Sequence, residues 1–185
     1  MRPYTGATYR GYRLMPHSWT LFDELMSLAT TVVGERYWWG GGSLASAKEF
    51  FETPRATSLE SDPFKFDCSG LAQWLMVAFY DLASRRQINV KELSVFNVYA
   101  AGLLDDYNST MLRELCDKTT QVSPGDLVFY DKHVEVCIGN GMLIGAMGGT
   151  SETHGDNQLA CVQIRPFGHR ANIRMVGRPK EQYRL

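Results

Sequence analysis

The sequence has no long hydrophobic run and no excess of charge of either sign. No apolar stretch approaches the roughly 18 residues that a membrane-spanning helix requires, so we expect no membrane span. The 19 Lys and Arg residues nearly balance the 20 Asp and Glu residues, and the formal net charge is -1. Proteins that bind nucleic acid ordinarily carry a basic surface, so nucleic acid is not an expected partner.

Cysteine and histidine are scarce, with four of each. The cysteines are Cys68, Cys116, Cys137 and Cys161, and no two of them have the CxxC spacing of a zinc site. A chain of 185 residues with its own core does not need a disulfide framework either. We therefore predict no metal and no cofactor, and we interpret all but Cys68 as small buried residues.

Internal repeats, low-complexity tracts and the apolar region of a secretory signal are also missing. We therefore expect synthesis in the cytoplasm. The length suits one domain, so we predict an irregular N-terminal arm over residues 1–17 and a single domain over residues 18–185.

The first part of the chain has helical periodicity. Residues 18–33 place apolar side chains three and four positions apart, with Ser18 as the N-cap and Gly34 as the stop. A second helix is predicted from residue 69, and further helical pieces over 91–107 and 109–118. The intervening stretch 43–65 contains Pro54 and Pro63 and is interpreted as a long surface excursion, either a functional lid or a disordered insertion.

The second part of the chain has the alternation of β-strands. "SPGDLVFY" enters one strand, and "HVEVCIGNGMLIGAM" contains Asn140–Gly141, a two-residue hairpin signal. "ACVQIRP" and "ANIRMVG" predict two more strands. Helices followed by an antiparallel sheet indicate an α+β fold.

Cys68 is the cysteine whose position favours chemistry. Asp67 is placed to cap the second helix, so Cys68 begins it, next to unpaired backbone N–H groups that stabilise a thiolate. Its own N–H could stabilise an oxyanion. A thiolate nucleophile also needs a base. Of the four histidines, only His133 opens a strand, where it could face the start of a helix packed on the sheet; His17, His154 and His169 lie in the arm or in polar loops.

Four blocks in this order resemble the NlpC/P60 family of papain-like cysteine peptidases, whose members cut peptidoglycan stem peptides. They are "GERYWWGG" (34–41), "FDCSGLAQWL" (66–75), "SPGDLVFY" (123–130) and "HVEVCIGNGMLIGA" (133–146). The resemblance implies a fold with N-terminal helices on a mostly antiparallel sheet and the nucleophile at a helix N-terminus. It also implies that 18–185 is a catalytic domain.

The resemblance also implies roles for single residues. Cys68 matches the nucleophile, His133 the general base, and Tyr37 a tyrosine whose hydroxyl lies close to the nucleophile. Tyr37 could instead be a core aromatic. Asp67 and Ser69 match positions that contact the free amine in those family members that require a free stem N-terminus, although Asp67 could serve only as a cap. Trp39 of the first block is a third candidate for substrate binding.

The chain departs from the family at the residue that orients the histidine. That position, on the strand after the hairpin, is Gly145, which has no side chain. The orienting group would then be a backbone carbonyl, a water molecule, or a side chain such as His154, Asp156 or Asn157. The "IGA" ending followed by "VQIRP" is similar to phage-associated members, which favours phage tail proteins as possible partners and action at the cell wall after release or within a virion.

We therefore expect a cell-wall hydrolase that cuts an amide bond of the stem peptide, plausibly γ-D-glutamyl to a diamino acid, through a thioester on Cys68. Two alternatives stay open. One is a catalytically weak or inactive docking module, which Gly145 favours. The other is an acyl or amide transferase, since an amine as well as water can resolve a thioester.

Overall fold

The computed structural model describes residues 7–39, 66–86, 92–98, 100–102, 109–148 and 160–185. Its helices are α1 (Trp19–Thr30), α4 (Cys68–Arg86), α5 (Ser109–Glu114) and the short 3-10 helix η1 (Glu181–Tyr183). Its strands are β1 (Thr8–Tyr9), β2 (Tyr12–Leu14), β3 (Cys116–Lys118), β4 (Gln121–Val122), β5 (Leu127–Phe129), β6 (Val134–Gly139), β7 (Met142–Ala146), β8 (Val162–Pro166) and β9 (Met175–Pro179).

The central element is a six-stranded sheet in the order β3-β9-β5-β6-β7-β8, in which all neighbours are antiparallel. The hairpin between β6 and β7 turns at Asn140 and Gly141, whose φ angles of 52° and 69° are those of the predicted two-residue turn. A second, three-stranded sheet has the order β1-β2-β4. The α+β prediction is confirmed.

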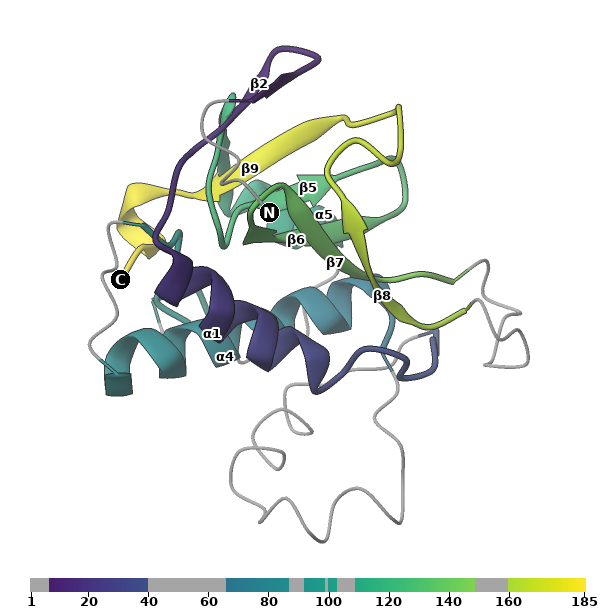
Figure 1. Ribbon diagram of the computed structural model, residues 1–185, viewed down its shortest axis with the longest axis horizontal. Coiled ribbons are helices and arrows are strands. Elements are labelled where there is room, and N and C mark those ends of the chain that lie inside the picture. The colour runs from purple at the N-terminus through teal and green to yellow at the C-terminus, as the bar shows by residue number, and fades with distance from the viewer. Residues whose placement is uncertain (1–6, 40–65, 87–91, 99, 103–108, 149–159) are drawn as a thin grey trace, which may run out of the picture.

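Local capping explains why the two main helices begin where they do. The Ser18 hydroxyl accepts a hydrogen bond from the Leu21 N–H at the start of α1. The Asp67 carboxylate accepts one of 2.7 Å from the Gly70 N–H, so Asp67 is the N-cap of α4 and Cys68 its first residue. In Figure 1 both helices lie together against one side of the sheet, where each contacts β6.

The sheet has an apolar cluster on each face. Val134, Val136 and Ile138 of β6 belong to the large core that includes α1 and α4. Cys137, between two of them, belongs to a smaller cluster with Leu14 of β2. Since side chains alternate along a strand, odd-numbered residues of β6 point away from the helices. This second face also carries the polar network described below.

The N-terminal arm was predicted to be irregular, and this is wrong for its described part. Residues 8–14 form the β1–β2 hairpin, and β2 pairs in parallel with β4 through Arg13–Gln121 and Leu14–Val122. Leu14 is buried against the second face of the sheet, which explains why the arm is ordered. The division of the chain at residue 17 stays a prediction.

Other predicted elements have mixed outcomes. The helix over 18–33 and the helix that starts at Cys68 are confirmed, as are the five predicted strands of the second half, which are β5 to β9. The described residues of 91–107 form turns and an isolated bridge, not a helix. The helix predicted over 109–118 ends at Glu114, and Cys116–Lys118 forms β3 instead. The predicted excursion at 43–65 lies outside the described residues.

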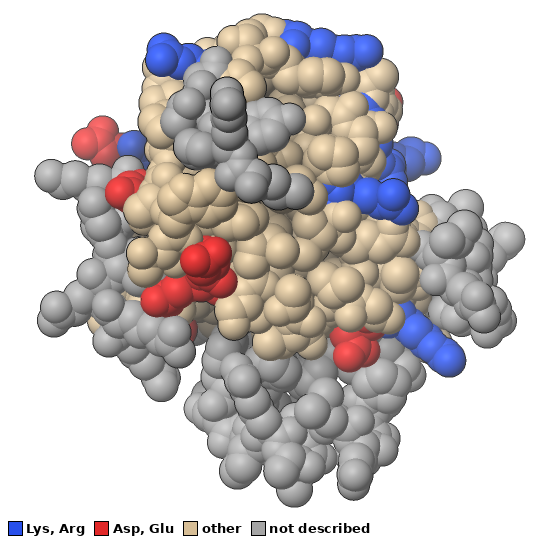
Figure 2. Space-filling model, viewed as in Figure 1, with Lys and Arg blue, Asp and Glu red and all other residues tan. Residues whose placement is uncertain are grey.

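Charged side chains on the face in Figure 2 form small separate groups of acidic and of basic residues among the described part of the chain. This face therefore has no continuous band of one sign among those residues. Within the same ranges, none of the helices combines the length and the hydropathy that crossing a membrane would need.

One ion pair is built into the fold. Arg178 of β9 donates to the fully buried Asp126 through Nε at 3.0 Å and Nη2 at 2.8 Å, and the Ser123 N–H donates to the same carboxylate at 2.8 Å. The pair joins β9 to the turn before β5. Removing one partner of such a pair leaves an uncompensated buried charge.

We therefore expect Arg178→Met to lower the free energy of unfolding by about 3 kcal/mol, measured by denaturant titration. The loss should shrink as the pH is lowered, because protonated Asp126 no longer needs a counter-charge. The matched control is Arg174→Met, which breaks an exposed pair with Asp131 and should change stability little. Equal effects of the two substitutions would contradict this reading of Asp126.

Candidate functional site

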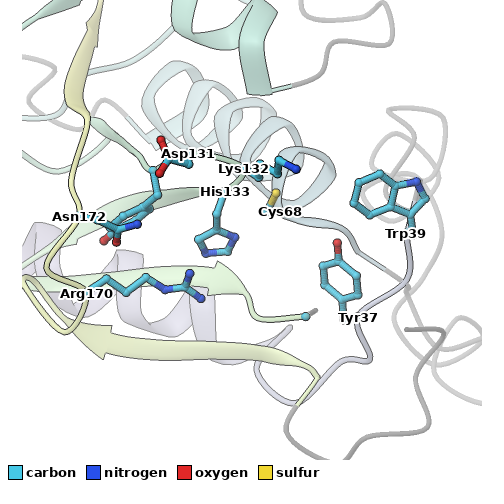
Figure 3. A pocket seen from close by; sticks show the side chains of 10 residues that line it. Tyr37, Trp39, Cys68, Asp131, Lys132, His133, Arg170 and Asn172 are labelled. Atoms are coloured by element: carbon cyan, nitrogen blue, oxygen red, sulfur yellow. The ribbon is translucent and has the colours of Figure 1, made fainter. Parts of the chain in front are cut away.

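A pocket of about 450 Å³ opens where the start of α4 meets the sheet. Cys68, His133, Tyr37 and Trp39 all line it, as predicted for one site from separate segments of the sequence. In the view of Figure 3 the Cys68 sulfur is drawn between the His133 ring and the Tyr37 hydroxyl. The remaining lining residues are Tyr130, Asp131, Lys132, Gly148, Arg170 and Asn172.

Cys68 is half-buried at the first position of α4. Burial raises the pKa of its thiol, although backbone hydrogen bonding from Val134, and then from Ser69 and Cys68 itself, acts in the opposite direction. The expected lowering of the pKa by the helix start is thus outweighed by desolvation. A thiolate at this position therefore depends on a base that takes the proton, and Val134 directly follows His133.

Tyr37 is buried, with 3% of its surface exposed, and lies against the backbone of Gly148. A Cβ at position 148 would stand 2.0 Å from Cγ of the Tyr37 ring, so only glycine fits there. Burial, followed by the charges of Cys68 and Asp67, raises the pKa of Tyr37 to about 12. The hydroxyl therefore keeps its proton at neutral pH and is available as a donor beside Cys68.

Of the three residues predicted to bind substrate, Trp39 lines the pocket, and Asp67 and Ser69 are not among its described lining residues. Trp39 is 54% exposed at the rim of the pocket. The Asp67 carboxylate accepts hydrogen bonds from the Ser69 hydroxyl at 2.9 Å and the Gly70 N–H at 2.7 Å. The geometry therefore favours the capping role for Asp67 over a binding role.

The residue that contacts His133 is not one that the sequence predicted. His133 Nε2 lies 3.0 Å from Oε1 of Glu135, which is two residues further along the chain, in β6. The prediction pointed to the backbone of Gly145 or to His154, Asp156 or Asn157. The last three lie outside the described residues, and Gly145 has no side chain to offer. The Glu135 side chain occupies the space above Gly145, a contact that was not predicted from the sequence.

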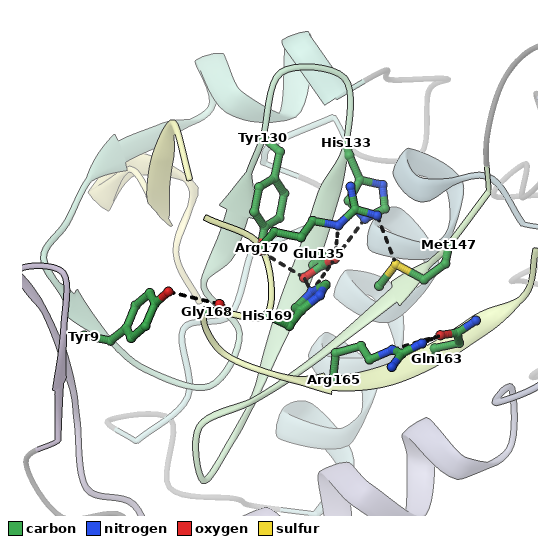
Figure 4. A network of polar contacts seen from close by, with 10 residues as sticks. All are labelled: Tyr9, Tyr130, His133, Glu135, Met147, Gln163, Arg165, Gly168, His169 and Arg170. Atoms are coloured by element: carbon green, nitrogen blue, oxygen red, sulfur yellow. Dashed lines mark hydrogen bonds and ion pairs between the residues drawn. The ribbon is translucent and has the colours of Figure 1, made fainter. Parts of the chain in front are cut away.

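Glu135 is the centre of a buried network, which Figure 4 shows. His169 Nε2 lies 3.0 Å from both carboxylate oxygens, and the Tyr130 hydroxyl donates to Oε2 at 3.2 Å. The Arg170 guanidinium lies 3.7 Å from Oε1 and stacks 5.5 Å above the Tyr130 ring. In the described ranges, no group of three or more His, Cys, Asp or Glu side chains could hold a metal ion.

Burial alone would raise the pKa of Glu135, but hydrogen bonds and charges from His133, and then from His169, outweigh it and lower the pKa. The carboxylate is therefore ionised at neutral pH, although none of its side chain is exposed.

One sequence signal could have found Glu135. Positions 133 and 135 are separated by the two-residue period of a strand, so their side chains share a face. A glutamate between two buried valines is also unusual, since Glu is almost never fully buried without a partner. No comparable signal marks Tyr130, His169 or Arg170, whose contact with Glu135 depends on how two loops fold.

This chain matches one family model and is similar to several solved structures. A family model described as the NlpC/P60 family matches residues 34–159, more than half of the chain. No curated protein matches. Among solved structures, the peptidoglycan hydrolase RipB from Mycobacterium tuberculosis is similar at a TM-score of 0.50 and 21% identity, over 86% of this chain and 64% of that chain.

A second similar structure is the P60 domain of an antigen from M. avium subspecies paratuberculosis. Its TM-score is 0.45 and its identity 18%, over 86% of this chain and 94% of that chain. NlpC2 from Trichomonas vaginalis is similar at a TM-score of 0.43 and 20% identity, over 91% of this chain and 49% of that chain. This chain thus spans less than two thirds of RipB and about half of NlpC2.

Proposed function

Because this chain belongs to the NlpC/P60 family, we propose that it is a cysteine peptidase that cuts an amide bond in peptidoglycan stem peptides. The observation that carries the proposal is that Cys68, His133 and Tyr37 come from three separate segments and line one pocket. The name of RipB as a peptidoglycan hydrolase supports the substrate class. A γ-D-glutamyl bond to a diamino acid is the proposed bond.

In the first half of the reaction, His133 Nδ1 takes the proton of the Cys68 thiol, and the sulfur attacks the amide carbonyl carbon. The oxyanion that forms is stabilised by the Cys68 N–H at the start of α4 and by the protonated Tyr37 hydroxyl. The C–N bond then breaks, His133 returns the proton to the leaving amine, and the acyl group stays on Cys68 as a thioester.

In the second half, water enters in place of the amine. His133 removes a proton from the water as its oxygen attacks the thioester carbon. The C–S bond breaks, the new carboxylic acid leaves, and the proton passes to sulfur to restore the thiol. The acidic and basic groups at the rim suit a substrate with carboxylates and amines. We assign the carboxylates of the substrate to Lys132 and Arg170, and Trp39 offers a flat apolar surface. Both oxygens of Asp131 already accept hydrogen bonds from Arg174.

Two alternatives remain for the same pocket. A catalytically weak docking module was favoured by the missing side chain at Gly145, but the contact between Glu135 and His133 weakens that argument. An acyl or amide transferase would use the same thioester and differ only in the acceptor. Phage tail proteins as partners, and action at the cell wall or within a virion, stay predictions.

The test is mass spectrometry of the products that the purified protein releases from sacculi of known stem composition. We expect fragments with one new amine and one new carboxyl group, and none when the protein is first treated with iodoacetamide. Products joined to an added amine would identify a transferase. The absence of new fragments from sacculi and from soluble stem peptides of several compositions would contradict the proposal.

A further inference from the structure

The Glu135 carboxylate lies directly behind His133 and has no contact with solvent. The Glu135 side chain is 0% exposed. Its carboxylate lies within hydrogen-bonding distance of two imidazoles and a tyrosine hydroxyl, and a guanidinium lies nearby. A buried carboxylate with this set of donors stays ionised. Glu135 is not among the described residues that line the pocket, so in this structure it can act on substrate only through lining residues that it contacts, which are His133, Tyr130 and Arg170.

An ionised carboxylate only accepts hydrogen bonds, and this fixes the tautomer of His133. With Oε1 of Glu135 at 3.0 Å, Nε2 of His133 must carry a proton and donate it. Nδ1 of the neutral ring is then the nitrogen with a free lone pair, and it can accept the thiol proton of Cys68. Once protonated, the imidazolium is further stabilised by the carboxylate behind it.

The register of the sheet explains why Gly145 accompanies Glu135. Val136 pairs with Ile144 across the β6–β7 hairpin, so Glu135 lies opposite Gly145 on the same face. A Cβ at position 145 would stand 2.7 Å from Cγ and 3.4 Å from Cδ of Glu135. The two positions therefore share one volume, and a side chain at 145 and the glutamate at 135 exclude each other.

We propose that Glu135, held in place by His169, is the residue that positions His133, and that Gly145 is a glycine because the orienting side chain has moved across the hairpin. In the family pattern the orienting residue belongs to position 145. Here the orienting side chain comes from the neighbouring strand β6 and contacts Nε2 of His133. The proposal rests on the cysteine peptidase chemistry proposed above.

The first experiment compares Glu135→Gln and Glu135→Ala with the wild type. We expect kcat on a soluble stem peptide to fall by about a hundredfold or more with KM little changed, since Glu135 acts through His133. A second readout needs no substrate: the rate of Cys68 alkylation against pH. Its acidic limb should move to higher pH, because an imidazolium without the carboxylate forms less readily. His169→Phe should shift both readouts in the same direction by a smaller amount.

The second experiment exchanges the two positions. Gly145→Asn alone should lower kcat, because the new side chain displaces Glu135. In the Glu135→Ala background the same substitution should raise kcat, because the amide oxygen of the introduced asparagine would then accept from His133. Gln163→Ala on β8, which pairs with position 145 and hydrogen-bonds to Cys161 and Arg165, is the control and should leave both readouts unchanged.

Two results would overturn the proposal. One is a wild-type alkylation profile in both variants at Glu135, with any change limited to thermal stability. The other is an equal cost of Gly145→Asn in both backgrounds, which would mean that the two positions do not compete. If instead the wild type cuts no peptidoglycan, the proposed function fails while the alkylation profile still tests Glu135.

Discussion

Cys68→Ala should abolish peptide cleavage while leaving the fold intact. The sulfur forms the bond to the acyl group, so no other atom of the pocket can replace it in a thioester mechanism. Removal of a nucleophile in a comparable hydrolase costs about a millionfold in kcat, and we expect a fall of at least about a thousandfold here. Cys68→Ser is expected to be nearly as inactive, since a hydroxyl is a far weaker acid than a thiol. The measurement is turnover of a soluble stem peptide under saturating conditions.

Cys161→Ala provides the matched control, because Cys161, which the sequence predicted to be buried, is instead partly exposed like Cys68. Cys161 directly precedes β8 and is not among the described residues that line the pocket. Its replacement by alanine should therefore leave turnover unchanged. The melting temperatures of both variants should stay close to that of the wild type, since removing one sulfur at these positions opens little volume. Turnover by Cys68→Ala at more than a few percent of the wild-type rate would rule out the covalent mechanism.

Local signals account for what the sequence predicted correctly about the fold. Ser18 and Asp67 cap helices through side-chain bonds to residues three positions later, and that contact depends on nothing distant. The turn at Asn140–Gly141 is equally local. The strands that were missed are two or three residues long, and their partners lie far away: β4 pairs with β2, and β3 pairs with β9. No period can be read from so few residues.

The same distinction applies to the site. That Cys68 and His133 line one pocket could be predicted, because Cys68 begins α4 and His133 directly precedes β6. The second face of the sheet was harder to predict. In "HVEV" the two valines predicted the face of the strand that packs against the core. The other two residues, His133 and Glu135, belong to the polar network on the opposite face. His169 reaches Glu135 across 34 positions of sequence, through a loop whose path no local pattern specifies.

His133→Ala should reduce turnover about as severely as loss of the nucleophile, by at least about a thousandfold. Burial raises the pKa of the Cys68 thiol, so without the imidazole the sulfur has no acceptor for its proton at neutral pH. Alkylation of Cys68 should therefore slow and become significant only above the ordinary thiol pKa of about 8.5. This second measurement separates loss of the base from loss of the fold.

The double variant Cys68→Ala with His133→Ala tests whether the two residues work as one unit. Residues that act in the same step are strongly non-additive, so we expect the double variant to be no slower than either single variant. A residual rate lower by the product of the two single effects would mean that His133 supports the reaction independently of the sulfur.

The Glu135→Gln variant should then be compared in the His133→Ala background. There it should have no further effect on kcat, because a carboxylate that positions the imidazole has nothing left to orient.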